Sequence, residues 1–207
     1  MTDAVGVGPH PRPWPSDPRL DPGLLADGDR RNVVDRYRYW TVDAVVADLD
    51  TRRHPFHVAV ENWQHDLNIG AVVRNANAFL ASSVRIVGRR RWNRRGAMVT
   101  DRYQHVHHHA DVDSLAAWAT DEGLPLVGVD NVAGAVAMLE ADAGALPRRC
   151  VLVLGQEGPG LSPAALQRCS AVLAIPQFGS TRSVNAGVAS GIAMYEWVRR
   201  YAPSPDS

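Results

Sequence analysis

The feature that most constrains this chain is a series of short apolar segments that alternate with segments of helical character. We expect five of the apolar segments to be strands: residues 56–60, 84–87, 125–129, 150–154 and 172–175. Helices are expected at residues 68–79, from Asp113 or Ser114 to near Gly123, at 133–139, from Ser162 onward, and at 185–201. This alternation predicts an α/β fold with a mostly parallel sheet covered by helices on both faces.

The N-terminal part of the chain differs from this alternating region. Residues 1–30 are rich in Pro, Gly and Asp and lack apolar periodicity, which predicts a flexible Pro-rich arm. Apolar residues then recur at roughly helical spacing, so we predict a helical N-terminal extension over residues 31–54. The α/β domain is expected to cover residues 55–202, followed by a short tail at 203–207.

Composition excludes several other classes of protein. The 207 residues are 45% hydrophobic, which suits a globular domain with an ordinary core. No apolar run approaches the ~20 residues that span a bilayer, and the N-terminus lacks the apolar core of a signal peptide. Cys150 and Cys169 form neither a disulfide framework nor a metal-binding pattern. We therefore expect a cytoplasmic protein with no membrane segment and no bound metal.

Positive charge is concentrated in one place, although the formal net charge of the chain is zero. All 22 basic residues are arginine, and several of them surround Trp92 and Asn93. Guanidinium groups suit phosphate and an indole ring can stack on a base. We therefore predict an RNA-binding loop that contains Arg89, Arg90, Arg91, Trp92, Arg94 and Arg95. The alternative is a solvated loop between two elements.

A histidine-rich stretch at residues 104–109 suggests a metal site at first sight. Adjacent histidines on an extended segment point to alternating faces, however, and no acidic or thiol residue lies at a ligand-like spacing. We expect this stretch to line an RNA approach or a dimer surface instead.

Polar residues gather where three of the predicted strands end. The segment after residue 60 contains Asn68 and, nearly two helical turns later, Arg74. The segment after residue 154 reads Gly-Gln-Glu-Gly-Pro-Gly and contains Glu157. The segment after residue 175 leads to Ser183 and Asn185 at a helix start. Because α/β sheets bind ligands at the carboxyl ends of their strands, these three loops predict a small-molecule site.

Each of these residues also has a plainer interpretation. Asn68 can be an ordinary helix N-cap, and Glu157 a solvated turn carboxylate. Arg74 can be a surface arginine, although its apolar neighbours favour a partly buried, oriented guanidinium. Neither a P-loop nor a dinucleotide-binding fingerprint is present, which argues against a nucleotide-binding oxidoreductase.

Together, the three segments resemble the motifs of a known family. The stretches NIGAVVR (from Asn68), LGQEGPG (from Leu154) and IPQFGSTRSVN (from Ile175) look like the three motifs of SpoU-type (TrmH-like, SPOUT superfamily) RNA 2′-O-ribose methyltransferases. The resemblance covers residues from about 55 to 200. It implies a deep C-terminal trefoil knot, S-adenosylmethionine as cofactor, a homodimer, and a ribose 2′-hydroxyl of tRNA or rRNA as methyl acceptor.

The resemblance also assigns roles to residues. The polar active-site set that it implies is Arg74, Asn68, Glu157, Ser183 and Asn185. The cofactor-binding positions are Val129, Gly155, Ile175, Ser183 and Val184. Three departures from the family pattern leave the catalytic side chains intact: Gln177 at a commonly apolar position, Ala186-Gly187 in place of Val-Ser, and Leu80-Ala81 in place of the usual Gly.

The leading interpretation is therefore an S-adenosylmethionine-dependent RNA ribose 2′-O-methyltransferase. In this family the proposed base is an arginine, here Arg74. A free guanidinium titrates above ~12, so a second possibility is that Arg74 grips the phosphate beside the acceptor and polarises the hydroxyl. A non-catalytic RNA-binding protein that retains the SpoU fold is the alternative function, and a base methyltransferase of the same superfamily is a minor one.

Overall fold

A computed structural model of the chain describes residues 6–63, 68–156 and 158–203. The chain divides into two compact units, with the boundary between Arg52 and Arg53. Each unit has its own elements and its own polar and apolar contacts, and each is described separately below.

The second unit is built on a seven-stranded sheet in which every neighbouring pair is parallel. The strand order is β3-β2-β1-β6-β4-β7-β5. The strands are β1 (Phe56–Asn62), β2 (Val84–Gly88), β3 (Val106–His109), β4 (Leu126–Val129), β5 (Val136–Ala137), β6 (Cys150–Leu154) and β7 (Ala171–Ala174). All five predicted strands are present, and the predicted parallel sheet is confirmed.

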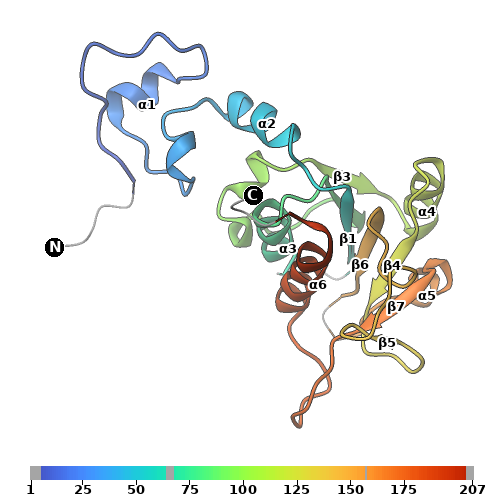
Figure 1. The fold of residues 1–207 in the computed structure, drawn as a ribbon. Helices are drawn as coiled ribbons and strands as arrows, with labels where there is room; N and C mark the ends of the chain where they lie inside the picture. The colour runs from blue at the N-terminus through green and yellow to red at the C-terminus, as the bar shows by residue number, and fades with distance from the viewer. Residues whose placement is uncertain (1–5, 64–67, 157, 204–207) are drawn as a thin grey trace. The chain divides into compact units, whose positions relative to one another are not determined.

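Helices cover both faces of the sheet, as predicted (Figure 1). Helices α3 (Ile69–Ala78) and α6 (Ala186–Tyr201) pack on one face, and α4 (Val112–Asp121) and α5 (Pro163–Arg168) pack on the other. The two-residue period of a strand sets this division, because Phe56 and Val58 of β1 face α3 and α6 while Ala59 faces α4. The fully buried Trp197 of α6 lies against Phe56, with ring centroids 4.5 Å apart.

Two predicted elements differ from the structure. Residues 133–139 contain the short edge strand β5 rather than a helix, because Gly134 turns the chain at a φ of 82°. Helix α4 begins earlier than predicted, since Asp111 is the N-cap and forms a capping box with Ser114. Asp111, Asp113 and Ser114 are all good N-cap residues, so composition alone does not choose among them.

A short connection with two 3₁₀ turns, η2 (Arg94–Ala97) and η3 (Thr100–Arg102), packs on α3. A Cβ atom on Gly70 would lie 2.7 Å from the Gly96 Cα and from the Ala97 nitrogen. The backbones of α3 and η2 are therefore in direct contact at Gly70. This contact fixes the arginine-rich loop beside the first turn of α3.

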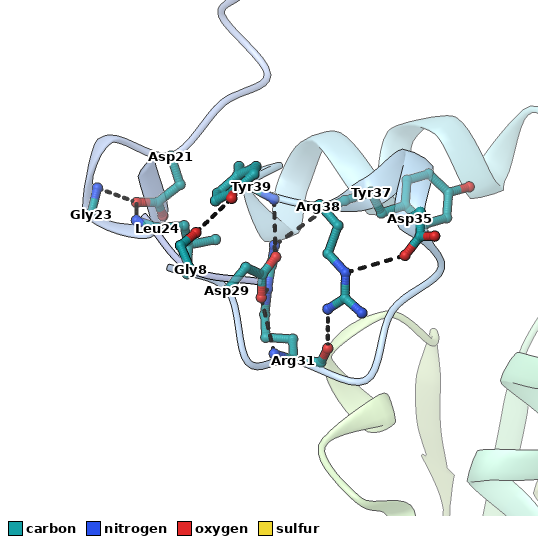
Figure 2. A network of polar contacts seen from close by, with 10 residues as sticks. All are labelled: Gly8, Asp21, Gly23, Leu24, Asp29, Arg31, Asp35, Tyr37, Arg38 and Tyr39. Carbon is teal, nitrogen blue, oxygen red and sulfur yellow. Dashed lines mark hydrogen bonds and ion pairs between the residues drawn. The ribbon is translucent and has the colours of Figure 1, made fainter. Parts of the chain in front are cut away.

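The first unit is organised by polar contacts around one buried carboxylate (Figure 2). It contains α1 (Pro22–Asp27), η1 (Asp35–Tyr37) and α2 (Val42–Asp50). The side chain of Asp29 is fully buried and accepts hydrogen bonds from Arg31 Nε at 2.9 Å, Arg31 Nη2 at 2.7 Å and the Tyr39 backbone N–H at 3.0 Å. These contacts hold the pKa of Asp29 at about 2, against the desolvation that burial imposes.

This unit differs from the arm and extension that the sequence predicts for residues 1–30 and 31–54. Helix α1 lies within the predicted arm, and bridges pair Val7 with Asp29 and Leu20 with Trp40. Residues 6–30 and 31–52 therefore belong to one unit. The apolar pattern gave no sign of this, because the contacts that define the unit are mostly between polar groups and backbone.

Candidate active site

Two of the three polar loops, those after β6 and β7, meet around a cavity of about 570 Å³ at the carboxyl ends of β4, β6 and β7. The described residues of the loop after β1 do not line this cavity, and that loop reaches it through Asn68, which contacts Asn185. The cavity is lined by residues after β4 (Val129–Val132), by the glycine-rich loop after β6 and by the long loop between β7 and α6. Val129, Gly155, Ile175, Ser183 and Val184 all line it. The structure thus brings together the five positions predicted to bind a cofactor, in a volume typical of small-molecule sites.

The glycine-rich loop after β6 is a tight backbone turn. Gln156 and Gly160 exchange backbone hydrogen bonds of 3.0 and 3.1 Å. A Cβ atom on Gly155 would overlap the backbone of Gly160 and Leu161, and Gly160 itself has a φ of 73°. Both glycines are therefore required by the path of the backbone.

Two carboxylates attach this loop to neighbouring strands. Asp130, after β4, accepts a hydrogen bond from the Leu161 N–H at 2.7 Å. Glu61, in β1, is fully buried and accepts hydrogen bonds from the Ser162 N–H at 2.8 Å and from Trp63 Nε1 at 2.9 Å. Both carboxylates have a structural role here, and no motif in the sequence indicated that either one is an anchor.

Asn185 and Asn68 meet at the edge of this cavity although 117 residues separate them in the chain. Asn185 Nδ2 donates to Asn68 Oδ1 at 2.8 Å, while Asn185 Oδ1 accepts from the Gly187 and Val188 N–H groups at 2.9 and 3.2 Å. Asn68 occupies the N-cap position of α3, but its side chain makes no capping hydrogen bond. The prediction that Asn68 lies at a helix start is confirmed, and its side chain contacts Asn185 instead of capping the helix.

The other predicted catalytic residues are Ser183, Arg74 and Glu157. Ser183 lines the cavity together with Asn185. Arg74 is exposed, so the expectation of a partly buried guanidinium is wrong. Its neighbours Val72 and Val73 face the core, and Arg74 points away from it. Glu157 lies outside the described residues.

The predicted RNA-binding loop has a fixed backbone and exposed arginines. The buried side chain of Asn62 donates from Nδ2 to the carbonyl oxygens of Arg89 and Arg91 at 2.6 and 3.0 Å. Trp92 is half-buried and packs against the core on the α3 side of the sheet. Exposed members of the loop are Arg89, Arg90, Arg91, Arg94 and Arg95. A second hollow of about 380 Å³ lies between this loop and His107 and His108 of β3.

The cavity wall also contains two glutamines that were not among the predicted site residues. Gln156 and Gln177 both line it, and the Oε1 atom of each is buried without a hydrogen-bond partner among the described residues. The position of Gln177, where the motif commonly has an apolar residue, was the signal that could have identified it.

The described residues contain no cluster of three or more His, Cys, Asp or Glu side chains arranged to hold a metal ion. Cys150 and Cys169 are free, and burial raises their pKa values to about 12 and about 11. Within the part of the chain that the structure covers, no helix has the length and apolar character to cross a membrane.

A sequence comparison identifies the family. The model of the SpoU rRNA Methylase family matches residues 55–195, a range that includes all three motif loops. This chain belongs to the SpoU family. The first unit, up to Arg52, lies outside the SpoU match.

Individual relatives agree with the SpoU assignment. An uncharacterized tRNA/rRNA methyltransferase of Mycolicibacterium vanbaalenii is 34% identical over 188 residues, which cover 86% of this chain and 58% of the relative. This chain therefore spans little more than half the length of that relative. The fold is similar to that of an AdoMet-bound rRNA methyltransferase from Sinorhizobium meliloti, with a TM-score of 0.63, 25% identity, and coverage of 75% of this chain and 61% of that one. It is also similar to an RNA 2′-O ribose methyltransferase, with a TM-score of 0.61, 27% identity, and coverage of 72% and 58%.

Proposed function

We propose that this protein transfers a methyl group from S-adenosylmethionine to a ribose 2′-hydroxyl of structured RNA, either tRNA or rRNA. The observation that carries the proposal is the Asn185–Asn68 contact at the edge of a cavity lined by three strand-end loops. Membership of the SpoU family supports the reaction class, and the similarity to a tRNA/rRNA methyltransferase and to an RNA 2′-O ribose methyltransferase supports an RNA substrate.

The residues around the cavity fit S-adenosylmethionine. The apolar side chains of Val129, Leu154 and Ile175 suit an adenine ring, and Asp130 and Asn131 place polar groups on the same cavity wall. Ser183 and the loop backbone supply further polar groups. A cavity lined by both apolar and polar groups matches a ligand that combines an aromatic base, a ribose and a charged amino-acid tail.

Bound S-adenosylmethionine supplies an electrophilic methyl group on a sulfonium. The protein must then hold the acceptor hydroxyl in line with that methyl group and let its proton leave. Asn185 is fixed at both ends of its amide, through Asn68 and through the first turn of α6. Asn185 Nδ2 has a second N–H besides the one donated to Asn68, so Asn185 can orient the hydroxyl while Asn68 holds its amide in place. Ser183 and Glu157 complete the proposed polar set.

Arg74 is proposed to grip the RNA phosphate beside the acceptor ribose. Its exposed position on α3 leaves the guanidinium fork accessible to a phosphate, which it can bind through two parallel hydrogen bonds. The arginine loop at residues 89–95 adjoins the same helix, so we propose that it continues this RNA-binding surface.

The role of Arg74 can be tested with a charge-conserving substitution. Arg74→Lys keeps the positive charge but removes the fork, and methyl transfer should fall to background. The matched control is Arg168→Lys on the exposed side of α5, which should leave the rate unchanged. Undiminished transfer by Arg74→Lys would show that the role given to Arg74 is wrong.

We further propose that the chain forms a homodimer through α6. Val188, Ile192 and Tyr195 follow one another at helical spacing and are 54%, 38% and 58% exposed, so a second copy of the chain would bury an apolar stripe. Ile192→Arg should convert the dimer to a monomer in sedimentation experiments, whereas a monomeric parent protein would contradict this proposal. The family resemblance also supports a trefoil knot in the C-terminal part and a cytoplasmic location, where tRNA and rRNA are found.

A labelled methyl-transfer assay tests the proposed function. The protein is incubated with total RNA and tritiated S-adenosylmethionine, and the RNA is then digested to nucleosides. We expect the label in 2′-O-methylated nucleosides. Label in a methylated base would identify a base methyltransferase, and RNA binding without any transfer would favour the non-catalytic alternative.

A further inference from the structure

The wall of the cavity contains one positively charged residue. Arg182, in the loop that joins β7 to α6, is the only basic residue among the described residues that line the cavity (Figure 1). It is exposed, so its guanidinium is open to solvent and to a ligand. Asp130 is the only acidic residue among the same lining residues. An anionic part of a ligand bound in this cavity therefore has one cation to meet.

The backbone of Arg182 is held in place at the cavity. Asn131, two residues after β4, donates from Nδ2 to the Arg182 carbonyl oxygen at 3.1 Å. Three residues further along the loop, Asn185 accepts hydrogen bonds from the first turn of α6. The loop is thus attached on one side to the end of a buried strand and on the other to a helix. This attachment limits where the Arg182 side chain can reach, which favours a defined contact over a freely solvated side chain.

No group of the protein occupies the Arg182 guanidinium. Within the described part of the chain, it forms neither an ion pair nor a hydrogen bond. The carboxylate of Asp130 is bound to backbone instead, since it accepts from the Leu161 N–H at 2.7 Å and from the Asn131 N–H at 2.7 Å. The donors of Arg182 are therefore available to an anion from outside the protein.

We propose that Arg182 binds the carboxylate of the methionyl tail of S-adenosylmethionine, which makes Arg182 a specificity-determining residue of the cofactor site. The inference rests on the proposed function, because it takes S-adenosylmethionine as the ligand of the cavity. The carboxylate is the only anionic group of this cofactor, and a guanidinium binds a carboxylate through two parallel hydrogen bonds. Arg182 is not among the cofactor-binding positions that the family resemblance implies.

An RNA phosphate is the other anion that an arginine of this protein would meet. The exposed arginines on α3 and in the loop at residues 89–95 do not line the cavity, so they suit an RNA that approaches from outside it. Arg182 lines the cavity itself, together with Ser183 and Val184. Its position therefore favours an anion that enters the cavity as part of the cofactor.

The test is calorimetric titration of the full chain with two ligands that differ by one group. S-adenosylhomocysteine has the carboxylate, and 5′-deoxy-5′-(3-aminopropylthio)adenosine has the same base, ribose, thioether and amine without it. Arg182→Met removes the charge and keeps an unbranched side chain, and Arg182→Lys keeps the charge without the fork. The matched control is Arg168→Met on the exposed side of α5.

We expect Arg182→Met to weaken binding of S-adenosylhomocysteine about tenfold, which corresponds to roughly 1.4 kcal/mol. Arg182→Lys should lose about threefold, since a point charge replaces a bidentate contact. Both variants should bind the analogue without the carboxylate as tightly as the parent protein does, and Arg168→Met should match the parent protein for both ligands. Higher salt should reduce the difference between Arg182→Met and the parent protein, because an exposed ion pair is screened.

The proposal is overturned if Arg182→Met binds S-adenosylhomocysteine as tightly as the parent protein does. A loss of RNA affinity in that variant, with binding of S-adenosylhomocysteine unchanged, would identify a phosphate contact instead. The proposal is also overturned if the substitution weakens both ligands equally, since that pattern indicates a distorted cavity. If the parent protein itself takes up neither ligand, the proposed function fails together with the inference, and this result is distinct from the others.

Discussion

At the scale of single residues, Asn185 connects the fold to the proposed chemistry. Its side-chain oxygen caps α6 through the Gly187 and Val188 N–H groups, and its side-chain nitrogen holds Asn68. The two atoms of one amide thus have separate tasks, one in stability and one in the active site. Substitutions at Asn185 can separate the two tasks.

We predict that Asn185→Asp keeps the helix cap and loses the proposed methyl transfer. A carboxylate still accepts from the first turn of α6 and suits the positive end of the helix dipole, but it has no N–H to offer. Thermal unfolding should be close to that of the parent protein, while methyl transfer falls at least tenfold. Asn185→Ala should lose about 1 kcal/mol of stability as well, because the cap is removed. Equal unfolding temperatures for the two variants would contradict the capping role.

A second residue-scale prediction concerns His57, whose imidazole lies in β1 near Trp118. Burial, helped by the nearby positive charge of Arg85, lowers the pKa of His57 to about 4. The unfolded chain takes up this proton near pH 6.5 and the folded chain only near pH 4, so stability should fall as the pH drops through this window. The expected loss is on the order of 2 kcal/mol after solvent screening. The free energy of unfolding in urea, measured across that pH range, should depend less on pH for His57→Gln than for the parent protein. Equal pH dependence of the two proteins would exclude His57 as the cause.

At the scale of elements, α3 is the platform that joins the other parts of the site. Asn75 Nδ2 donates to the Gly187 carbonyl at 2.8 Å and to Ser190 Oγ at 2.9 Å, which attaches α3 to the start of α6. Gly70 contacts Gly96, which attaches α3 to the arginine loop. One helix therefore sets the positions of Asn68, Arg74 and the loop at residues 89–95.

We predict that Gly70→Ala destabilises the protein although alanine favours helices. Helix propensity would give a gain of up to about 1 kcal/mol. The added Cβ would lie 2.7 Å from backbone atoms of Gly96 and Ala97, which cannot rotate away, so overpacking of about 1–3 kcal/mol should outweigh that gain. In Gly191→Ala, the control in α6, the nearest atom is the end of the Asn75 side chain at 3.3 Å. In chemical unfolding, Gly70→Ala should have a lower free energy of unfolding than both the parent protein and this control. The reverse order would contradict the contact between Gly70 and Gly96.

The elements that the sequence predicts well are those with a strong apolar pattern. The five apolar strands and the helices at Ile69–Ala78 and Ala186–Tyr201 follow directly from such patterns. The two-residue strand β5 is too short to show any period, and its neighbours set its conformation. The backbone conformation of Leu80 could not be predicted from the apolar pattern either. Its φ of 55° lies in the left-handed region, at a position where the family usually has glycine.

The site contains some residues that could be predicted from the sequence and some contacts that could not. Val129, Gly155 and Ser183, which line the cavity, could be predicted from the family resemblance. The contact between Asn68 and Asn185 and the buried oxygen of Gln177 could not, because each depends on how distant loops converge. The exposure of Arg74 depends on which side of α3 faces the sheet, and apolar neighbours on a helix do not decide this alone.

At the scale of the whole molecule, the chain is a SpoU domain preceded by a small unit of different construction. The SpoU domain has two apolar cores, one on each face of its sheet. The first unit relies on Asp29, whose buried carboxylate is paired with Arg31. The two units should therefore respond differently to substitutions of charged residues.

We predict that Asp29→Asn unfolds the first unit without weakening cofactor binding. Breaking a buried ion pair leaves the partner's charge uncompensated and destabilises a protein by about 3–5 kcal/mol. The control is Asp35→Asn, because Asp35 pairs with Arg38 at 3.6 Å but its own side chain is 99% exposed (Figure 2). Limited proteolysis should cleave residues 6–52 rapidly in Asp29→Asn only. Equal resistance of residues 6–52 to the protease in the two variants would contradict the central role of Asp29.

The central claim is that three loops from separate parts of the chain form one S-adenosylmethionine site. Hydrogen–deuterium exchange with and without S-adenosylhomocysteine measures this most directly. We predict slower exchange in the loops after β4, β6 and β7, which line the cavity, and no change in residues 6–52. Protection of only one of these loops, or of none of them, would contradict the account.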